Sequence, residues 1–149
     1  MRGKRLPART YRPVPKTRIL VIDDDRAVCT ATTMLLESKG YDVVTAADGK
    51  SGVAAIKAAP FDLVIVDLFM PGMDGLETTK AIQRHNRSVP VIWVSGFMLG
   101  NRRLEMPNFA AMAKEAGALA TLYKPFQPPV LFEAIQKALA GPASMAGAG

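Results

Sequence analysis

Short apolar runs alternate with helical segments along most of this sequence, and this alternation restricts the possible folds most strongly. The apolar runs occupy residues 19–22, 41–46, 63–66, 90–94 and 119–123. They have the length of strands, and runs without polar interruptions are typical of strands buried on both faces of a sheet. Five strand–helix units in succession predict an α/β fold, a doubly wound five-stranded parallel sheet with helices on both faces.

Capping residues set the expected helix boundaries. Helices are expected at about 26–39, 49–59, 76–85, 109–116 and 128–140. Asp25 and Asp48 precede the first two, and their carboxylates are suited to accept hydrogen bonds from the first helical N–H groups. Gly40 and Gly117 follow the first and fourth helices, where glycine favours a stop. The stretch between the fourth strand and the fourth helix is expected to be irregular.

The composition is that of a soluble globular domain. The chain has 149 residues, of which 49% are hydrophobic and 21% charged, so it is long enough for one core. The chain has one cysteine, Cys29, so it cannot form an intrachain disulfide framework. We expect Cys29 to be a small core residue, and the protein to be cytoplasmic. No apolar run approaches the ~18 residues of a membrane span, and the basic N-terminus lacks the apolar region of a secretory signal.

The net charge of +6 is concentrated at the N-terminus. Residues 1–18 hold seven of the nineteen basic residues and none of the thirteen acidic ones. Three interpretations of this arm stay open: a solvated tail or an incorrectly assigned start, docking to an acidic partner surface, and non-specific binding to phosphate backbones. We expect a basic, proline-containing flexible tail at 1–17, a folded domain at 18–140 and a flexible C-terminal tail at 141–149.

Polar residues follow four of the five expected strands. Asp23 and Asp24 come directly after the first strand, Asp67 after the third, Ser95 after the fourth and Lys124 after the fifth. In an open parallel sheet, ligands bind beyond the carboxyl ends of the strands. The sequence therefore predicts that three acids, a hydroxyl and an amine gather at one edge of the sheet.

The chemistry of this set favours phosphoryl transfer. Clustered carboxylates repel each other, and a hard divalent cation such as Mg²⁺ relieves that repulsion. A carboxylate is also a nucleophile that forms an aspartyl phosphate. A metal and a lysine would neutralise the charge of a transferring phosphoryl group, and a hydroxyl would donate to one of its oxygens.

The motifs at these strand ends resemble the receiver domain of two-component response regulators, a chemotaxis-type fold. In chain order they are Ile19–Asp24 (ILVIDD), Asp62–Gly75 (DLVIVDLFMPGMDG), Val91–Gly96 (VIWVSG) and Lys124–Phe126 (KPF). Each closes a predicted strand, and together they span roughly residues 18–140, in the family's order. The resemblance implies the flavodoxin-like strand order 2-1-3-4-5.

The resemblance also implies a role for each acid. Asp67 would be the phosphoacceptor. Asp24 and Asp67 would ligate Mg²⁺ through their carboxylates, and the backbone carbonyl of Phe69 would be a third ligand. Asp23 would hold the metal through water, whereas Asp25 is expected to cap the first helix.

The remaining site roles fall on the fourth and fifth strands. Lys124 would pair with the phosphoryl group, and Ser95 would bond one of its oxygens and reposition on activation. The resemblance implies a cis peptide between Lys124 and Pro125.

Three features depart from the family's pattern. The activation switch is usually an aromatic residue three positions before the lysine, and Thr121 stands there; Tyr123 is expected to face the wrong side to replace it. The segment 96–108 is longer than usual, which suggests an altered partner surface. Phe69 and Phe97 are bulky where the family tunes hydrolysis, so a long-lived aspartyl phosphate is expected.

The function implied is that of a stand-alone response regulator. It would accept a phosphoryl group on Asp67 from a histidine kinase or phosphotransfer protein in a two-component phosphorelay, and signal through protein–protein contacts with an unidentified output protein. It would be a phosphoacceptor rather than an enzyme, with Mg²⁺-dependent self-phosphorylation and autodephosphorylation. No fused DNA-binding domain is expected, because few residues follow the last helix. The oligomeric state is left open.

Two other functions stay open. A haloacid-dehalogenase-like phosphatase would use Asp23 as its nucleophile, although Ala27 stands where that family has threonine or valine. The other alternative is a receiver-like binding module that is never phosphorylated. It stays open because Thr121 stands where the family usually has its aromatic switch residue. The site of phosphorylation discriminates among the three.

Overall fold

The computed structural model describes residues 16–68, 74–95, 98–99, 102–103 and 109–141. Its strands are β1 (Arg18–Ile22), β2 (Asp42–Ala46), β3 (Leu63–Asp67), β4 (Val91–Ser95), β5 (Met98–Leu99), β6 (Arg102–Arg103) and β7 (Ala120–Tyr123). Its helices are α1 (Arg26–Glu37), α2 (Gly49–Ala58), α3 (Gly75–His85), α4 (Phe109–Ala116) and α5 (Pro128–Ala140). Within the described residues, no helix has both the length and the apolar character needed to cross a membrane.

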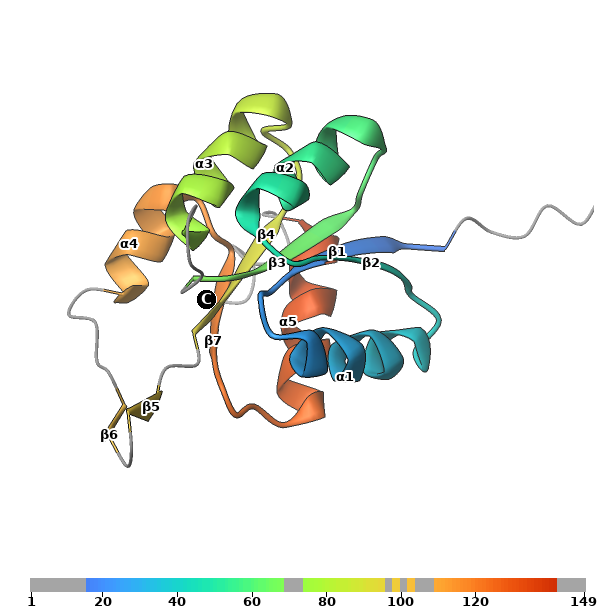
Figure 1. Ribbon diagram of the computed structural model, residues 1–149, viewed down its shortest axis with the longest axis vertical. Coiled ribbons are helices and arrows are strands. Elements are labelled where there is room, and N and C mark those ends of the chain that lie inside the picture. The colour runs from blue at the N-terminus through green and yellow to red at the C-terminus, as the bar shows by residue number, and fades with distance from the viewer. Residues whose placement is uncertain (1–15, 69–73, 96–97, 100–101, 104–108, 142–149) are drawn as a thin grey trace, which may run out of the picture.

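Five of the strands form one parallel sheet in the order β2-β1-β3-β4-β7. This confirms the predicted order 2-1-3-4-5, since β7 is the fifth strand of the main sheet. Helices α1 and α5 cover one face, and α2, α3 and α4 cover the other (Figure 1). The doubly wound fold follows from right-handed crossovers between parallel strands.

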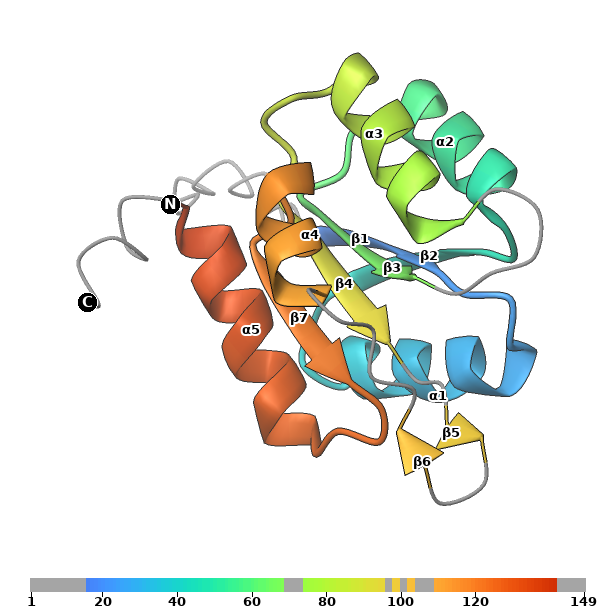
Figure 2. The ribbon, with the colours of Figure 1, turned by 90° about the vertical axis from the view of Figure 1, so that its left-hand side faces the viewer.

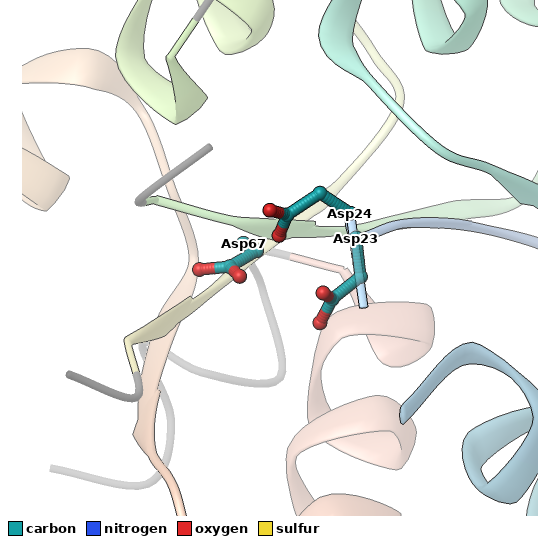
Figure 3. Close-up of side chains that lie close together, drawn as sticks. All are labelled: Asp23, Asp24 and Asp67. Atoms are coloured by element: carbon teal, nitrogen blue, oxygen red, sulfur yellow. The ribbon is translucent and has the colours of Figure 1, made fainter. Parts of the chain in front are cut away.

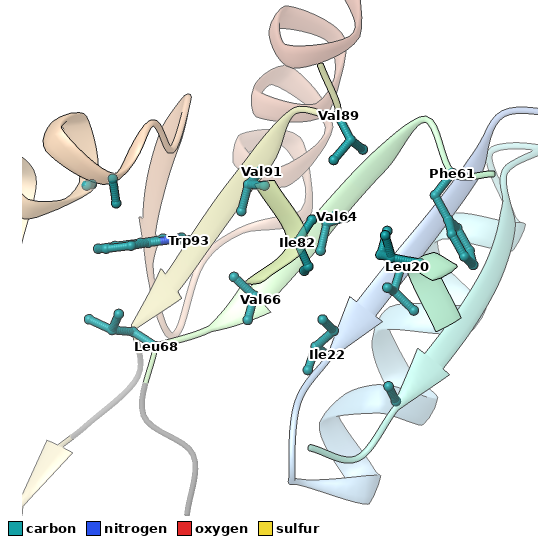
Figure 4. Packing of buried hydrophobic residues seen from close by; sticks show 14 residues of the cluster. Leu20, Ile22, Phe61, Val64, Val66, Leu68, Ile82, Val89, Val91 and Trp93 are labelled. Atoms are coloured by element: carbon teal, nitrogen blue, oxygen red, sulfur yellow. The ribbon is translucent and has the colours of Figure 1, made fainter. Parts of the chain in front are cut away.

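The sheet separates two apolar layers, which explains why the strand sequences are apolar at nearly every position. Leu20 and Ile22 of β1 face the layer of α2, α3 and α4, and Ile19 and Val21 face the layer of α1 and α5. The first layer is seen in Figure 4, with Trp93 of β4 between the sheet and α4. Trp93 is fully buried.

The helix boundaries match the capping residues closely. Asp25 and Asp48 each accept hydrogen bonds from backbone N–H groups of the turn that follows, and Asp74 does so for α3. Gly40 and Gly117 have positive φ angles of 87° and 83°, which glycine adopts without the steric cost of a side chain. The capping and stop predictions for Asp25, Asp48, Gly40 and Gly117 are therefore confirmed.

A short antiparallel pair, β5 and β6, lies where only irregular structure was predicted. Met98 pairs with Arg103, and Leu99 pairs with Arg102. Read as sequence alone, Gly100 and Asn101 are a pair of residue types that predicts a hairpin. That signal was available in the sequence, but strands of two residues are too short to show an apolar period.

Helix α3 is joined to the sheet by a chain of buried hydrogen bonds. The indole Nε1–H of Trp93 donates to Thr79 Oγ1 at 2.8 Å, and that hydroxyl donates to the carbonyl of Gly75 at 2.7 Å. A Cβ atom on Gly75 would lie 2.5 Å from Leu68 Cα and 2.7 Å from the Asp67 carbonyl oxygen. Glycine is therefore needed where α3 begins, against the end of β3.

We predict that Thr79→Val lowers the free energy of unfolding by about 1–3 kcal/mol, because it removes both hydrogen bonds of a buried hydroxyl. Thr78→Val is the matched control. Both threonines are fully buried, but the Thr78 hydroxyl finds no hydrogen-bond partner among the described residues. Its replacement should be neutral or stabilising in urea denaturation. Equal losses in the two variants would contradict the assigned role of Thr79.

Candidate functional site

Three carboxylates meet at the carboxyl ends of β1 and β3. Asp23 and Asp24 directly follow β1, and Asp67 is the last residue of β3, the neighbouring strand. One carboxylate oxygen from each lies within 4.8 Å of the others (Figure 3). Asp23 and Asp67 are only 4% and 8% exposed, whereas Asp24 is exposed. The predicted gathering of these three residues is confirmed.

Lys124 brings its ammonium group to the two buried acids. Its Nζ lies 2.7 Å from Asp23 Oδ2 and 3.6 Å from Asp67 Oδ2. Burial by itself would lower the pKa of Lys124, but the hydrogen bond to Asp23 and the charges of Asp67 and Asp23 outweigh it, so that pKa is raised. Lys124 is therefore held in its charged form beside the acids.

Ser95 completes the set at the end of β4. It is 8% exposed, and its carbonyl accepts a hydrogen bond of 2.7 Å from the backbone N–H of Lys124. The peptide bond between Lys124 and Pro125 is cis, as predicted. Four of the five strand ends thus contribute to one edge of the sheet.

Asp23 is fixed more firmly than its sequence position suggested. Its Oδ1 accepts from the backbone N–H of Asp25 at 2.9 Å, and its own N–H donates to the Ala46 carbonyl at 3.0 Å. Its second carboxylate oxygen accepts from Lys124. This arrangement orients the Asp23 carboxylate and the lysine together.

The thiol of Cys29 also contacts this region. Its Sγ donates to the Asp23 carbonyl at 3.2 Å, so Cys29 is a half-buried neighbour of the site rather than the core residue that was expected. Burial raises the pKa of the thiol, and the negative charge of Asp23 raises it further. Both effects disfavour the thiolate, which is the reactive form of a cysteine. No sequence signal marked this contact.

The donor set fits Mg²⁺. Three carboxylates and one ammonium leave an excess of negative charge, and oxygen ligands are those that Mg²⁺ prefers. Asp24 is exposed and offers its oxygens to an ion arriving from solvent. Phe69, whose carbonyl is the expected third ligand, lies outside the described residues.

The fifth strand of the sheet corrects one prediction. Thr121 pairs with Trp93, which faces the layer of α3 and α4, while Leu122 belongs to the opposite layer. Tyr123 is two positions from Thr121, and alternate strand residues share a face. The prediction that Tyr123 faces the wrong side is therefore wrong. Tyr123 is 41% exposed at the end of the strand. Phe97 lies outside the described residues.

We predict that Asp24→Ala lowers the affinity for Mg²⁺ by about tenfold or more, because it removes the exposed carboxylate of the cluster. Asp25→Ser is the control: serine also caps helices, so α1 is kept while a neighbouring carboxylate is lost. Isothermal titration calorimetry should show near wild-type affinity for this control. Unchanged affinity in Asp24→Ala would contradict the assignment.

Comparison with known proteins places this geometry in a family. The family model of the response regulator receiver domain matches residues 19–136. The transcriptional regulatory protein ZraR of Salmonella typhimurium is 38% identical over 125 residues, which cover 84% of this chain and 27% of ZraR. The chain therefore spans about a quarter of the length of that relative.

Solved structures show the same fold. A CheY-like receiver domain protein from Methanospirillum hungatei matches with a TM-score of 0.76 at 31% identity, covering 85% of this chain and 95% of the other. The chemotaxis protein CheY4 of Vibrio cholerae matches with a TM-score of 0.74 at 29% identity, covering 83% and 99%. A sequence match that runs from β1 into α5 on this fold leads to one conclusion: the chain belongs to the response regulator receiver domain family of two-component systems.

Proposed function

We propose that this receiver domain accepts a phosphoryl group on Asp67 from a histidine kinase or a histidine phosphotransfer protein. The observation that carries the proposal is the buried Asp67 carboxylate, which lies beside both the Lys124 ammonium group and the Asp23–Asp24 pair. A nucleophilic carboxylate, a cation and a metal-type acid cluster are the parts that phosphoryl transfer needs. Family membership supports the same assignment.

The proposed step exchanges one bond to phosphorus for another. A carboxylate oxygen of Asp67 bonds to the phosphorus while the bond from phosphorus to the histidine nitrogen breaks, and the electron pair stays on the imidazole. When bound, Mg²⁺ would offset the negative charge of the phosphoryl oxygens. We assign its ligands to Asp24 and Asp67, with Asp23 acting through water and the carbonyl of Phe69 as a further ligand.

Lys124 and Ser95 would bind the transferred group. The ammonium group of Lys124 already lies 3.6 Å from Asp67, so a phosphoryl group on Asp67 would come within its reach. Asp23 holds that ammonium group at 2.7 Å and so positions it before transfer. The Ser95 hydroxyl, at the end of the neighbouring strand, would donate to a phosphoryl oxygen.

The alternative of a phosphatase with Asp23 as nucleophile is weaker. One oxygen of that carboxylate accepts a hydrogen bond from the Asp25 N–H and the other accepts from Lys124, which lowers its nucleophilicity. The Asp67 carboxylate, by contrast, lies 3.6 Å from the Lys124 ammonium group, so that group can neutralise charge on a phosphoryl group bound to Asp67.

We also propose that the domain works without a fused output domain, in the cytoplasm, and signals by binding another protein. The match to the chemotaxis protein CheY4 supports a domain without a fused partner, because it covers 99% of that chain. ZraR, by contrast, is several times longer than the segment that matches this chain. We further propose that the folded domain runs from residue 18 to residue 140, between tails at 1–17 and 141–149. The mass of the native protein isolated from its source would test it, because an attached output domain would add to that mass.

We predict that incubation with Mg²⁺ and acetyl phosphate adds one phosphoryl group, which intact-mass spectrometry detects. Asp67→Asn should abolish the adduct, because an amide is not a sufficiently strong nucleophile. Asp48→Asn, which alters an exposed helix cap and keeps its capping ability, should retain it.

Chelation of the metal by EDTA should suppress labelling in the wild type. An adduct that persists in Asp67→Asn and maps to Asp23 would support the phosphatase instead. No adduct in a folded protein would identify a binding module that is not phosphorylated.

We predict further that the aspartyl phosphate is long-lived. Phe69 and Phe97 follow Asp67 and Ser95 by two positions in the sequence, and bulky apolar side chains there would exclude the attacking water. Phe69→Asn should then lose its label faster than the wild type, measured as the decay of the adduct after the phosphodonor is removed. Equal decay rates in the two proteins would contradict this explanation.

A further inference from the structure

Helices α3 and α4 are side by side on one face of the sheet (Figures 1 and 2). Two cavities are lined by residues of α3, and one of them lies between α3 and α4. One, of about 440 Å³, is lined by α3 and the residues that follow it, among them Lys80, Arg84 and Arg87. The other, of about 340 Å³, lies between the helices and is lined by Leu76, Lys80 and Met112, among others. Because Lys80 lines both, we treat them as one surface and call it the α3–α4 groove.

The first part of the groove is basic and uncompensated. Lys80, Arg84 and Arg87 are all exposed, and the described residues give none of them an ion-pair partner. Lys80 and Arg84 are four positions apart on one helix, where like charges are destabilising. The negative end of the helix dipole accounts for Arg84 in the last turn of α3, but not for Lys80 one turn earlier.

The second part of the groove is largely apolar. Leu76 and Met112 are half-buried and pack against the core layer, so each shows part of its apolar surface to the cavity. Methionine adapts its shape to different partners. The exposed carboxylate of Glu115 lies at the same cavity, which makes this part unfavourable for a polyanion.

We propose that the α3–α4 groove binds an acidic, amphipathic segment of a partner protein. Acidic side chains of the segment would pair with Lys80, Arg84 and Arg87, and its apolar side chains would pack on Leu76 and Met112. A nucleic acid would use only the basic part, and Glu115 would repel its phosphates. The basic N-terminal arm of this chain carries the wrong charge to occupy the groove.

The groove is physically connected to the phosphoacceptor, although it shares no residue with that site. Helix α3 begins at Gly75, which closely approaches the Asp67 carbonyl, and Thr79 beside Lys80 bonds to Trp93. A partner that binds along α3 would therefore contact the element that packs on the end of β3. The chain has a single tryptophan, so its fluorescence reports on this element.

The test uses a fluorescein-labelled helical peptide of about 14 residues, with leucine on one face and glutamate on the other. We expect it to bind the wild-type protein in a fluorescence anisotropy titration and to change the emission of Trp93. The double variant Lys80→Glu/Arg84→Glu should weaken binding by about tenfold or more. Lys50→Glu/Lys57→Glu, with the same charge change on exposed residues of α2, should weaken it less than about twofold.

Further variants separate the parts of the proposal. Met112→Gln should also weaken binding of the peptide, because it replaces an apolar contact with a polar one. Lys80→Gln/Arg84→Gln, which removes the charges without reversing them, serves if the double glutamate variant folds poorly. Labelling of Asp67 by acetyl phosphate should be unchanged in both charge variants, so the outcome here is distinct from that of the proposed function.

Several results would overturn the proposal. One is that the peptide does not bind the wild-type protein, and another is that the α2 control variant loses as much affinity as Lys80→Glu/Arg84→Glu. A third is that a polyglutamate peptide of the same length binds equally tightly, which would show that the groove is only a basic patch for anions. A duplex oligonucleotide that binds more tightly than the peptide, and depends on Lys80 and Arg84, would assign the groove to nucleic acid instead.

Discussion

The ion pair between Lys124 and Asp23 holds together the edge of the sheet on which the chemistry depends. Three carboxylates at the end of an apolar sheet would repel each other, and two of them are nearly inaccessible to solvent. The ammonium group of Lys124 lies between the two buried acids and is kept charged by them. A metal that binds there joins a site in which one cation is already fixed and the repulsion is already partly relieved.

The surrounding fold holds this site in a definite position. The strands β1 and β3 are buried on both faces, so the backbone that carries the acids has little freedom. Helix α3 closes against the end of β3 through Gly75, and the hydrogen bonds of Thr79 and Trp93 link that helix to β4. The elements that contact the end of β3 directly are therefore α3 and β4. The α3–α4 groove lies on one of these elements, helix α3.

Some of the site could be predicted because it follows from chain order. Parallel strands bring their carboxyl ends to one edge, so the positions of these residues at the ends of four strands were sufficient to place them together: Asp23, Asp67, Ser95 and Lys124. The contacts inside the site were not predictable in the same way. Lys124 and Asp23 are 101 residues apart, and which acid the ammonium group prefers depends on side-chain directions that only packing fixes. The same holds for the Cys29 thiol on the Asp23 carbonyl.

The sequence by itself determined the α/β class, the helix caps and the set of strand-end residues, because these depend on local periodicity and on backbone hydrogen bonding. The strand order came from the resemblance to a known family and not from the alternation, which many parallel sheets share. Only the tertiary structure decided which groups pair across the sheet, and that three cations and an apolar surface form one groove. These features arise where separate elements meet, and their energies depend on distances that no single segment of the chain encodes.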